Sequence, residues 1–204
     1  MTSLLVGISG GSGSGKSRLA NDLANELGRD RCTVIPFDSY YKDLRHLSLS
    51  ERDQVNFDHP DSLDAELFGH HLDALAEGMD VCMPVYDFAR HQRSDDLVFT
   101  PAADVVIAEG ILLLAFPELA SRFDLKIFRS APGDLRFSRR VERDVEERGR
   151  TAESVREQFE RSVAPMHEEF VEPSAAIADR VIEHTEDLDE VVSQLAHQLQ
   201  LLAV

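Results

Sequence analysis

The sequence predicts an α/β protein with a central five-stranded parallel sheet and helices on both of its faces, a three-layer fold. Short apolar runs alternate with amphipathic helical patterns along the 204 residues, as in proteins with parallel sheets. A glycine-rich stretch, "GISGGSGSGKSRLA", separates the first apolar run from the first helical pattern. No repeat, low-complexity tract or linker divides the chain, so a single domain over residues 1–204 is expected.

The predicted strands are apolar runs at residues 4–8, 32–37, 105–108, 125–128 and 180–183. The predicted helices carry apolar residues at helical spacing and cover residues 16–27, 62–76, 134–148, 152–163 and 188–202. Residues 81–100 break the alternation, because the polar stretch "ARHQRSD" lies between two apolar runs. This segment is expected to form a β-hairpin inserted into the α/β scaffold.

The composition limits the partners of the protein. The formal net charge of −17 argues against DNA or RNA, since their phosphates would be repelled. No apolar run approaches the length of a membrane span, and the N-terminus lacks the features of a secretory signal, so no membrane contact and a cytoplasmic location are expected. Cys32 and Cys82 lie inside apolar runs without a partner at metal-ligand spacing, so both are expected to be buried free thiols.

The glycine-rich stretch fits the phosphate-binding P-loop pattern G-x-x-x-x-G-K-[ST]. Glycines let successive backbone N–H groups turn toward phosphate oxygens at the N-terminus of the following helix. The residues of this loop are Gly10, Gly11, Ser12, Gly13, Ser14, Gly15, Lys16 and Ser17. Lys16 is expected to reach the β- and γ-phosphates, and the Ser17 hydroxyl to bind Mg²⁺. A flexible glycine-serine turn is the alternative, but the strand before the pattern and the helix after it favour nucleotide binding.

Three acidic residues are candidates for the chemistry. Glu109 ends the apolar run "VVIAEG", where an acid beside a P-loop serves the metal ion. Asp38 ends another predicted strand, so it faces the same edge of the sheet as Lys16 and is a candidate general base. A turn-capping aspartate before Ser39 is the alternative for Asp38. Asp58 lies in "NFDHPDSLD", before a proline that opens a helix, and taken alone this segment is also typical of a helix cap.

Arginines gather in the segment "DLRFSRRVERDVEERGR", and Arg148 and Arg150 end it. One face of the predicted helix carries Arg136, Arg139, Arg140 and Arg143. An apolar stripe on roughly the opposite side consists of Phe137, Val141 and Val145. A solvated helix with i, i+4 ion pairs is one interpretation. In an acidic chain with a P-loop, a lid over residues 134–165 that supplies positive charge to phosphates is favoured.

Taken together, these segments resemble the uridine-cytidine kinases, within the P-loop kinase group that also contains phosphoribulokinase. The matching segments occur in family order over nearly the whole chain: "GISGGSGSGKS", "FDSYYKD", "NFDHPDSLD", "PVYDFARHQR", "VVIAEGI", "DLRFSRRVERDVEERGR" and Gln158 in "REQFERSVAPMHEEF". The later segments are specific to this family and not to P-loop proteins in general. The resemblance implies the P-loop NTPase fold and ATP-dependent phosphorylation of the 5′-hydroxyl of uridine and cytidine.

The resemblance also implies roles for individual residues. Asp38 would accept the proton of the 5′-hydroxyl and, with Ser17 and Glu109, serve Mg²⁺, while Asp58 would bind the ribose hydroxyls. Arg143 and Arg148 would reach the phosphates of ATP alongside Lys16. The nucleoside would be lined by Tyr41, Tyr86, His91, Arg140, Arg150 and Gln158. A homo-oligomer, typically a tetramer, is the implied assembly.

Two alternatives stay open at this point. A phosphoribulokinase-like or other small-hydroxyl kinase would have a similar P-loop and similar aspartates, although Tyr86, His91 and Gln158 suit a flat base. A regulatory module that binds a nucleotide without transferring its phosphate is the second alternative. The donor is ATP or GTP, because no base-recognition motif is visible, and the preference between uridine and cytidine is also open.

Overall fold

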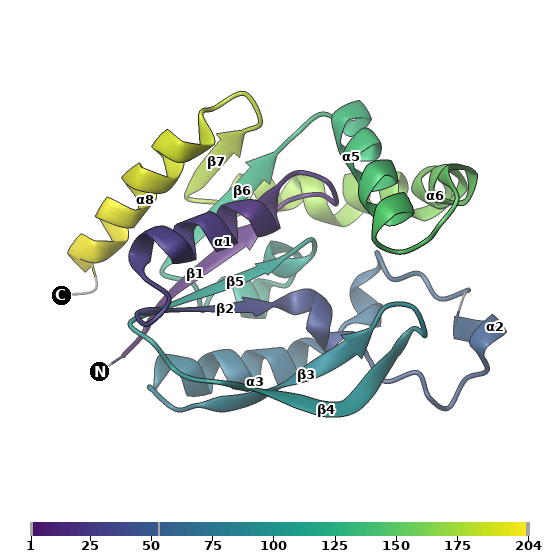
Figure 1. Cartoon of the computed structure of the whole chain (residues 1–204). Coiled ribbons are helices and arrows are strands. Elements are labelled where there is room, and N and C mark those ends of the chain that lie inside the picture. Colours follow the sequence, from purple (N-terminus) through teal and green to yellow (C-terminus); the bar gives the residue numbers. More distant parts are fainter. Residues whose placement is uncertain (1, 53, 203–204) are drawn as a thin grey trace.

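The computed structural model describes residues 2–52 and 54–202, so Met1, Asp53 and residues 203–204 of the expected domain lie outside the described residues. Its centre is a sheet of five parallel strands in the order β2-β5-β1-β6-β7 (Figure 1). The strands are β1 (Leu4–Ser9), β2 (Cys32–Pro36), β5 (Val105–Gly110), β6 (Leu125–Ser130) and β7 (Arg180–Glu183). The predicted five-stranded parallel sheet is therefore confirmed.

Helices cover both faces of this sheet (Figure 1). On one face lie α1 (Lys16–Leu27) and α8 (Leu188–Leu202), and on the other α3 (Ala65–Ala76) and α4 (Pro117–Ala120). Successive residues of a strand point to opposite faces, so Val6 of β1 packs with α1 and α8, whereas Leu5 packs in the cluster that contains α3. Burial on both faces explains why these strands are continuous apolar runs.

The chain between β2 and α3 crosses the edge of the sheet where the strands end. It contains η1 (Phe37–Tyr40), α2 (Leu49–Arg52) and η2 (Pro60–Ser62), and η3 (Leu113–Ala115) follows β5 in the same way. The helix predicted from residue 62 starts instead at Ala65, because the Asp64 carboxylate accepts a hydrogen bond from the Leu67 N–H at 3.1 Å and caps α3. Asp38 and Asp58 both lie on this crossing segment.

The predicted hairpin is present as β3 (Val81–Asp87) paired antiparallel with β4 (Gln92–Thr100). Arg93 of β4 fixes it beside the crossing segment, where it donates to the Tyr41 carbonyl at 2.8 Å. Cys32 is buried as expected, and burial raises the pKa of its thiol to about 12. The expectation for Cys82 is wrong, because it is exposed. Strand β3 alternates its side chains, and Cys82 lies on the opposite side from the buried Val81.

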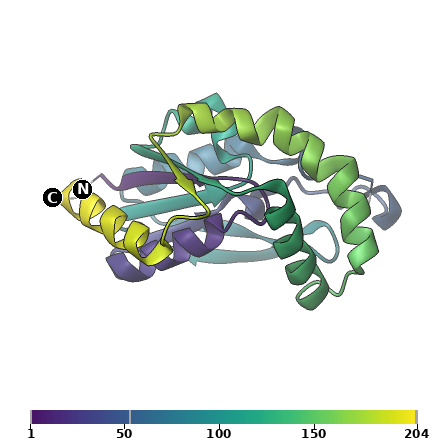
Figure 2. The same cartoon turned by 90° about the horizontal axis from the view of Figure 1, so that it is seen from above.

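The arginine-rich segment forms α5 (Gly133–Glu146), and a long helical run follows it. This run consists of α6 (Ala152–Gln158), the π-turns η4 (Phe159–Val163) and η5 (His167–Val171) on either side of α7 (Ala164–Met166), and the 3₁₀ segment η6 (Glu172–Ile177). Figure 2 shows it as one bent arm beside the sheet. The predicted end at residue 163 is wrong. Pro165 lacks a backbone N–H, and the helix continues through it by widening into π-turns.

Among the residues that the structure describes, no helix is both long and apolar enough to cross a lipid bilayer.

Candidate active site

The P-loop connects β1 to α1 in a conformation that requires glycine at two positions. Gly10 and Gly13 have φ values of 146° and 81°, in the region that L side chains rarely adopt. A Cβ atom at Gly10 would lie 2.4 Å from the Arg129 carbonyl oxygen, and one at Gly13 would lie 2.3 Å from that of Arg136. The loop is therefore closely packed against the chain around β6 and α5, and it is not a flexible turn.

The remaining residues of the loop complete a backbone cradle at the start of α1. The Ser14 N–H donates to the Gly11 carbonyl at 3.0 Å, and Gly15 caps α1 with a left-handed conformation. Ser12, Ser14 and Lys16 are buried here, and the Ser14 hydroxyl has no hydrogen-bond partner. Helix N-termini with exposed N–H groups and a nearby lysine favour anions such as phosphate. The structure thus confirms the expected context of a strand, a loop and a helix.

Glu109 meets the P-loop from the end of β5. The Ser17 hydroxyl donates to Glu109 Oε1 at 3.1 Å, and Lys16 Nζ lies 4.0 Å from Glu109 Oε2. Burial raises the pKa of the Glu109 carboxyl, and the Lys16 charge opposes this rise. Glu109 Oε2 is buried without a hydrogen-bond partner. An unsatisfied buried carboxylate oxygen beside a P-loop serine has the chemistry of a metal ligand, because Mg²⁺ prefers oxygen donors.

Asp38 lies in η1, directly after β2. Its Oδ1 atom is buried without a hydrogen-bond partner, so this oxygen caps no turn. Burial is the main cause that raises the pKa of Glu109 on one side and those of Tyr41 and Asp58 on the other, and the charge of Asp38 adds to each rise. Asp38 is therefore near both the P-loop acid and a second group of residues on the crossing segment.

The oxygens of Ser17, Asp38 and Glu109 fit a Mg²⁺ ion by their chemistry, because two of the three side chains present orphaned carboxylate oxygens. Within residues 2–52 and 54–202 no three histidine, cysteine or acidic side chains come together to hold a metal ion by themselves. Two carboxylates and one hydroxyl still suit Mg²⁺, because this ion commonly takes one or two carboxylates and completes its shell with water and substrate phosphates.

Asp58 is buried, with 7% of its surface exposed. Burial raises the pKa of its carboxyl, and the charge of Arg140 partly offsets this rise. The helix cap that the motif also suggested is supplied by its neighbour, because His59 Nδ1 accepts a hydrogen bond from the Asp61 N–H at 3.1 Å. Asp58 is thus held at low exposure beside a cationic side chain and does not cap η2.

An aromatic cluster lies between the crossing segment and the hairpin. The rings of Tyr41 and Tyr86 are 5.1 Å apart, and the Phe57 ring lies 5.3 Å from Tyr41. His91 stacks on Phe57 with ring centroids 4.7 Å apart, and Phe88 lies 5.2 Å from Tyr86. His91 has a φ of 50° at the turn of the hairpin, a conformation uncommon outside glycine. The structure thus brings together three of the predicted side chains, Tyr41, Tyr86 and His91.

The lid contacts the P-loop through its arginines. Arg140 Nη1 donates to the Ser12 hydroxyl at 2.9 Å, and Arg139 Nη1 donates to the Gly13 carbonyl at 3.3 Å. Gln158 Oε1 accepts hydrogen bonds from both Arg140 and Arg150. The predicted residues Arg140, Arg150 and Gln158 therefore form one network, which joins the P-loop to α5 and α6.

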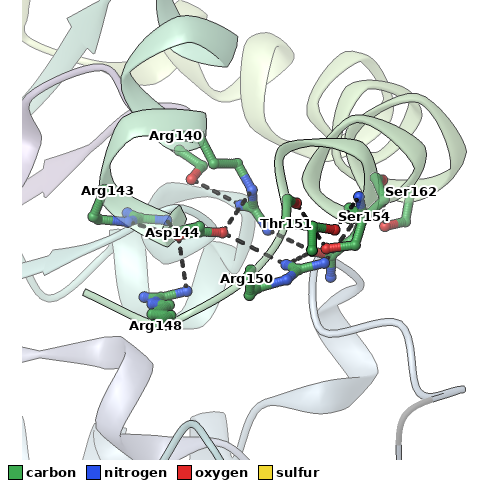
Figure 3. Close-up of polar contacts among 10 residues, drawn as sticks. Arg140, Arg143, Asp144, Arg148, Arg150, Thr151, Ser154 and Ser162 are labelled. Carbon is green, nitrogen blue, oxygen red and sulfur yellow. Dashed lines mark hydrogen bonds and ion pairs between the residues drawn. The ribbon is translucent and has the colours of Figure 1, made fainter. Parts of the chain in front are cut away.

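Asp144 holds the arginines of the lid together, as Figure 3 shows. Its side chain has no exposed surface and accepts two hydrogen bonds from Arg143, at 3.0 and 2.8 Å. The other guanidinium groups within ion-pair distance belong to Arg140 at 3.6 Å, Arg148 at 3.4 Å and Arg150 at 3.5 Å. Arg148 also lies over the Phe88 ring, 5.2 Å from its centroid. The lid arginines thus share one buried counter-ion and reach the aromatic cluster.

Helix α5 turns its charged face inward. Arg136, Arg140 and Asp144 are buried, whereas Val145 of the predicted apolar stripe is 40% exposed. The reason is that α5 packs on the polar P-loop and not on the apolar core, so polar partners are available on the inner side. A solvated arginine face is therefore excluded for Arg136 and Arg140.

The sequence reasoning missed several residues of this site. Phe57 lies in the segment "NFDHPDSLD" and Phe88 in "PVYDFARHQR", and neither ring was predicted to be part of the site. Asp144 was also missed, although it is four residues from both Arg140 and Arg148. His167 lies beside Gly11 and Arg136, and its burial lowers its pKa to about 4, with a further contribution from the Arg136 charge.

Comparison with known proteins adds the family. A model described as "Phosphoribulokinase / Uridine kinase family" matches residues 5–190. A uridine kinase from Chloroflexus aurantiacus is 43% identical over 201 residues, covering 97% of this chain and 96% of that protein. A uridine kinase from Clostridium novyi is 43% identical over 182 residues, covering 89% and 88%.

Among solved structures, the phosphoribulokinase from Rhodobacter spheroides is similar with a TM-score of 0.66 and 14% identity, covering 91% of this chain and 73% of that chain. This likeness supports the P-loop kinase fold alone. The family match, in contrast, runs from β1 through the lid and into α8. The chain belongs to the phosphoribulokinase and uridine kinase family.

Proposed function

We propose that this protein is a nucleoside kinase that transfers the γ-phosphoryl group of ATP to the 5′-hydroxyl of uridine and cytidine. The observation that supports this most is the position of Asp38, which lies two residues after Pro36, the partner of Glu109 in the sheet, and three residues before Tyr41 of the aromatic cluster. A carboxylate between the P-loop and the aromatic cluster suits a phosphate acceptor that carries a nucleobase. The relatives named uridine kinase, at 43% identity over most of the chain, point to the same acceptor.

The phosphate donor is proposed to bind with its β- and γ-phosphates in the P-loop. Backbone N–H groups and Lys16 contact the phosphates there, and Arg143 and Arg148 approach them from the lid. Ser17, Asp38 and Glu109 would hold Mg²⁺, which supplies charge neutralisation of the phosphates when bound. ATP is the donor that the family implies, and GTP is the alternative to be compared with it.

Asp38 is proposed to act as the general base. Its carboxylate takes the proton from the 5′-hydroxyl as the 5′-oxygen forms a bond to the γ-phosphorus and the bond from that phosphorus to the bridging oxygen breaks, releasing ADP. Lys16 and the lid arginines stabilise negative charge on the phosphoryl oxygens during this transfer. The buried Oδ1 atom of Asp38 has no competing hydrogen-bond donor, so it is available to the hydroxyl.

The nucleoside is proposed to bind between Asp58 and the aromatic cluster. The Asp58 carboxylate would accept hydrogen bonds from both ribose hydroxyls, while Tyr41 and Tyr86 pack beside the base and the sugar. His91 would donate to the 4-oxygen of uracil or accept from the 4-amino group of cytosine, depending on its tautomer. Arg140, Arg150 and Gln158 would close the site from the lid.

The resemblance to the uridine-cytidine kinases supports a cytoplasmic homotetramer as the working form of the protein. Light scattering coupled to size-exclusion chromatography measures the mass directly, with four times 22.8 kDa as the expected result. A monomer at working concentration would reject this assembly without affecting the proposed chemistry.

The proposed function is tested by the kcat/KM of the purified protein for uridine, cytidine and ribulose 5-phosphate in one coupled ADP-release assay. Comparable values for the two nucleosides, with little activity on the sugar phosphate, are expected. Activity on ribulose 5-phosphate alone would assign the chain to the other branch of its family. ATP binding without turnover on any acceptor would favour a regulatory module.

A further inference from the structure

Asp144 has no part in the proposed reaction, yet it is the most completely buried carboxylate of the lid. Its exposed fraction is 0%, and four guanidinium groups surround it (Figure 3). A buried carboxylate is costly unless it keeps charged partners, so its position implies a strong requirement for these arginines. The arrangement of the four partners around its two oxygens is unequal.

Asp144 Oδ1 carries all the hydrogen bonds. It accepts from Nε and Nη2 of Arg143 at 3.0 and 2.8 Å, and Arg148 Nη1 lies 3.4 Å away. Asp144 Oδ2 has no hydrogen-bond partner and faces Arg140 Nε at 3.6 Å and Arg150 Nη1 at 3.5 Å. Arg140 Nε is also buried without a hydrogen-bond partner. Donors and an acceptor thus face each other at a distance just beyond a hydrogen bond.

The two pairs of arginines belong to different parts of the site. Arg143 and Arg148 have side chains 34% and 36% exposed, and they are the arginines proposed to reach the phosphates. Arg140 has a side chain only 8% exposed, and with Arg150 it holds Gln158 on the side of the nucleoside. One carboxylate therefore contacts both the two arginines proposed to reach the phosphates and the two that hold Gln158.

We propose that Asp144 is a positioning residue that couples the two substrate sites, an inference that rests on the proposed function. When donor phosphates draw Arg143 and Arg148 away, Oδ1 loses its hydrogen bonds, and the buried carboxylate turns toward Arg140 and Arg150. A shift of about half an ångström converts the facing groups into charge-assisted hydrogen bonds. Arg140 and Arg150 are then held more firmly, and with them Gln158 and the nucleoside.

Coupling of this kind is reciprocal. If the donor raises the affinity for the nucleoside by some factor, the nucleoside raises the affinity for the donor by the same factor. The quantity to measure is therefore the ratio of two uridine dissociation constants, one without nucleotide and one with a saturating non-hydrolysable ATP analogue and Mg²⁺. Isothermal titration calorimetry on the full chain gives both values. A ratio of at least about five is expected for the wild-type protein.

Asp144→Asn keeps the shape of the side chain but removes the charge that the four arginines share. Its ratio is expected to fall to about one, while circular dichroism still shows the folded protein. Glu142→Gln is the matched control, because it neutralises an exposed carboxylate on the same helix, and it is expected to keep the wild-type ratio. An Asp144→Asn protein that keeps the full ratio, or a control that loses it, would overturn the inference.

Arg143→Ala provides a second test that does not depend on the folding of Asp144→Asn, because Arg143 is partly exposed. Without Arg143, Oδ1 is released even when no nucleotide is bound. Uridine alone should then bind more tightly than it does to wild type, approaching the affinity measured with the ATP analogue. Unchanged or weaker binding would reject the coupling.

The outcomes separate this inference from the proposed function. A wild-type protein that fails to bind uridine, or fails to phosphorylate it, contradicts the proposed function. A wild-type protein that phosphorylates uridine but shows a ratio of one contradicts only the role of Asp144.

Discussion

Asp38 and Asp64 are two aspartates of the same crossing segment with different environments. Asp64 accepts a hydrogen bond from the Leu67 N–H and pairs with Arg93 at 3.0 Å, so its role is structural. Asp38 Oδ1 is buried without a hydrogen-bond partner beside other acids. Leaving a buried carboxylate oxygen unsatisfied is unfavourable for stability, which suggests that substrate or metal completes this site.

Asp38→Asn is expected to remove phosphoryl transfer and to leave nucleotide binding nearly intact. The amide keeps the shape of the side chain but accepts no proton, and loss of a positioned general base costs on the order of 10²–10⁴ in rate. Single-turnover transfer to uridine and ATP binding are measured on the same protein. Asp61→Asn, which neutralises an aspartate side chain that is 91% exposed, is the control. An Asp38→Asn protein within about threefold of wild type contradicts the assignment.

Asp58 should make the enzyme discriminate strongly against 2′-deoxynucleosides. Removal of one ribose hydroxyl leaves a desolvated carboxylate oxygen unpaired, and sites of this kind reject the lacking analogue by as much as ~10⁴ in kcat/KM. The comparison is between uridine and 2′-deoxyuridine, and cytidine should behave like uridine. Asp58→Asn should shrink this difference. Equal kcat/KM values for uridine and 2′-deoxyuridine in the wild-type protein would exclude a ribose contact for Asp58.

His167 should make the stability of the protein depend on pH. Burial and the Arg136 charge lower its pKa from the usual histidine value of 6.5 to about 4, so the folded state disfavours the protonated ring. The stabilisation is fully present above pH 6.5, and it is lost as the pH falls from 6.5 through about 4. The expected loss is on the order of 1–2 kcal/mol, below the full linkage value because the ring is partly exposed.

Melting temperatures of wild type and His167→Gln at pH 7 and pH 4.5 measure this effect. The melting temperature of the variant should fall less between pH 7 and pH 4.5 than that of wild type, because glutamine does not titrate. His197→Gln, at an exposed position on α8, should behave like wild type. Equal losses in wild type and His167→Gln would show that His167 is not held neutral by the fold.

Single residues were predictable where the sheet dictates their position. Asp38 and Glu109 follow apolar runs, and the ends of parallel strands meet at one edge, so their proximity to Lys16 follows from the pattern. Asp144 could not be singled out in this way. Its i, i+4 spacing to an arginine is shared by Glu147, which follows Arg143 by four residues and is exposed. Only burial distinguishes the two acids, and burial depends on tertiary packing.

At the scale of elements, α5 shows how a helix can be amphipathic with its charged side inward. The sequence pattern indicates two faces but not which one is covered. Arg139 and Arg140 bind the P-loop directly, whereas the apolar stripe packs on the helical arm, where the Phe137 and Phe159 rings are 5.1 Å apart. The lid thus contacts the P-loop through arginine hydrogen bonds. Guanidinium groups that donate to P-loop oxygens can also donate to phosphate oxygens.

Arg143→Ala and Arg148→Ala are expected to lower kcat by a much larger factor than they change the KM for uridine. Both side chains are proposed to contact phosphate charge, which changes during transfer, so their interactions should be stronger in the transition state. Steady-state kinetics with uridine and ATP, with circular dichroism as the folding control, measures the effect. If kcat were unchanged in both variants, these arginines would have no role in phosphoryl transfer.

The helical arm was predictable only in its first part. The pattern ends at residue 163 because Pro165 usually stops a helix, yet the chain continues through π-turns to Ile177. This continuation places His167 beside Gly11 and carries Val171 into the core. Tertiary packing therefore overrides the local signal, and no single-sequence pattern reports it.

At the scale of the whole molecule, the number and direction of the main strands follow from the sequence, and their order does not. Strand β1 lies in the middle because β5 and β6 both pair with it, and those pairings join segments far apart in the chain. The net charge of −17 is compatible with binding phosphates because a group of arginines lies beside the P-loop: Arg136, Arg139, Arg140, Arg143, Arg148 and Arg150. The predicted fold and P-loop are confirmed, whereas the roles of the site residues stay predictions.

The most direct test of this account is identification of the product formed from uridine and ATP. Wild-type protein, Mg²⁺, ATP and uridine are incubated together, and the nucleotide product is separated and examined by ³¹P and ¹H NMR. Uridine 5′-monophosphate, formed in equal amount to ADP, is the predicted result. Release of ADP without a phosphorylated nucleoside, or a phosphate on another hydroxyl of the ribose, would contradict the central claim.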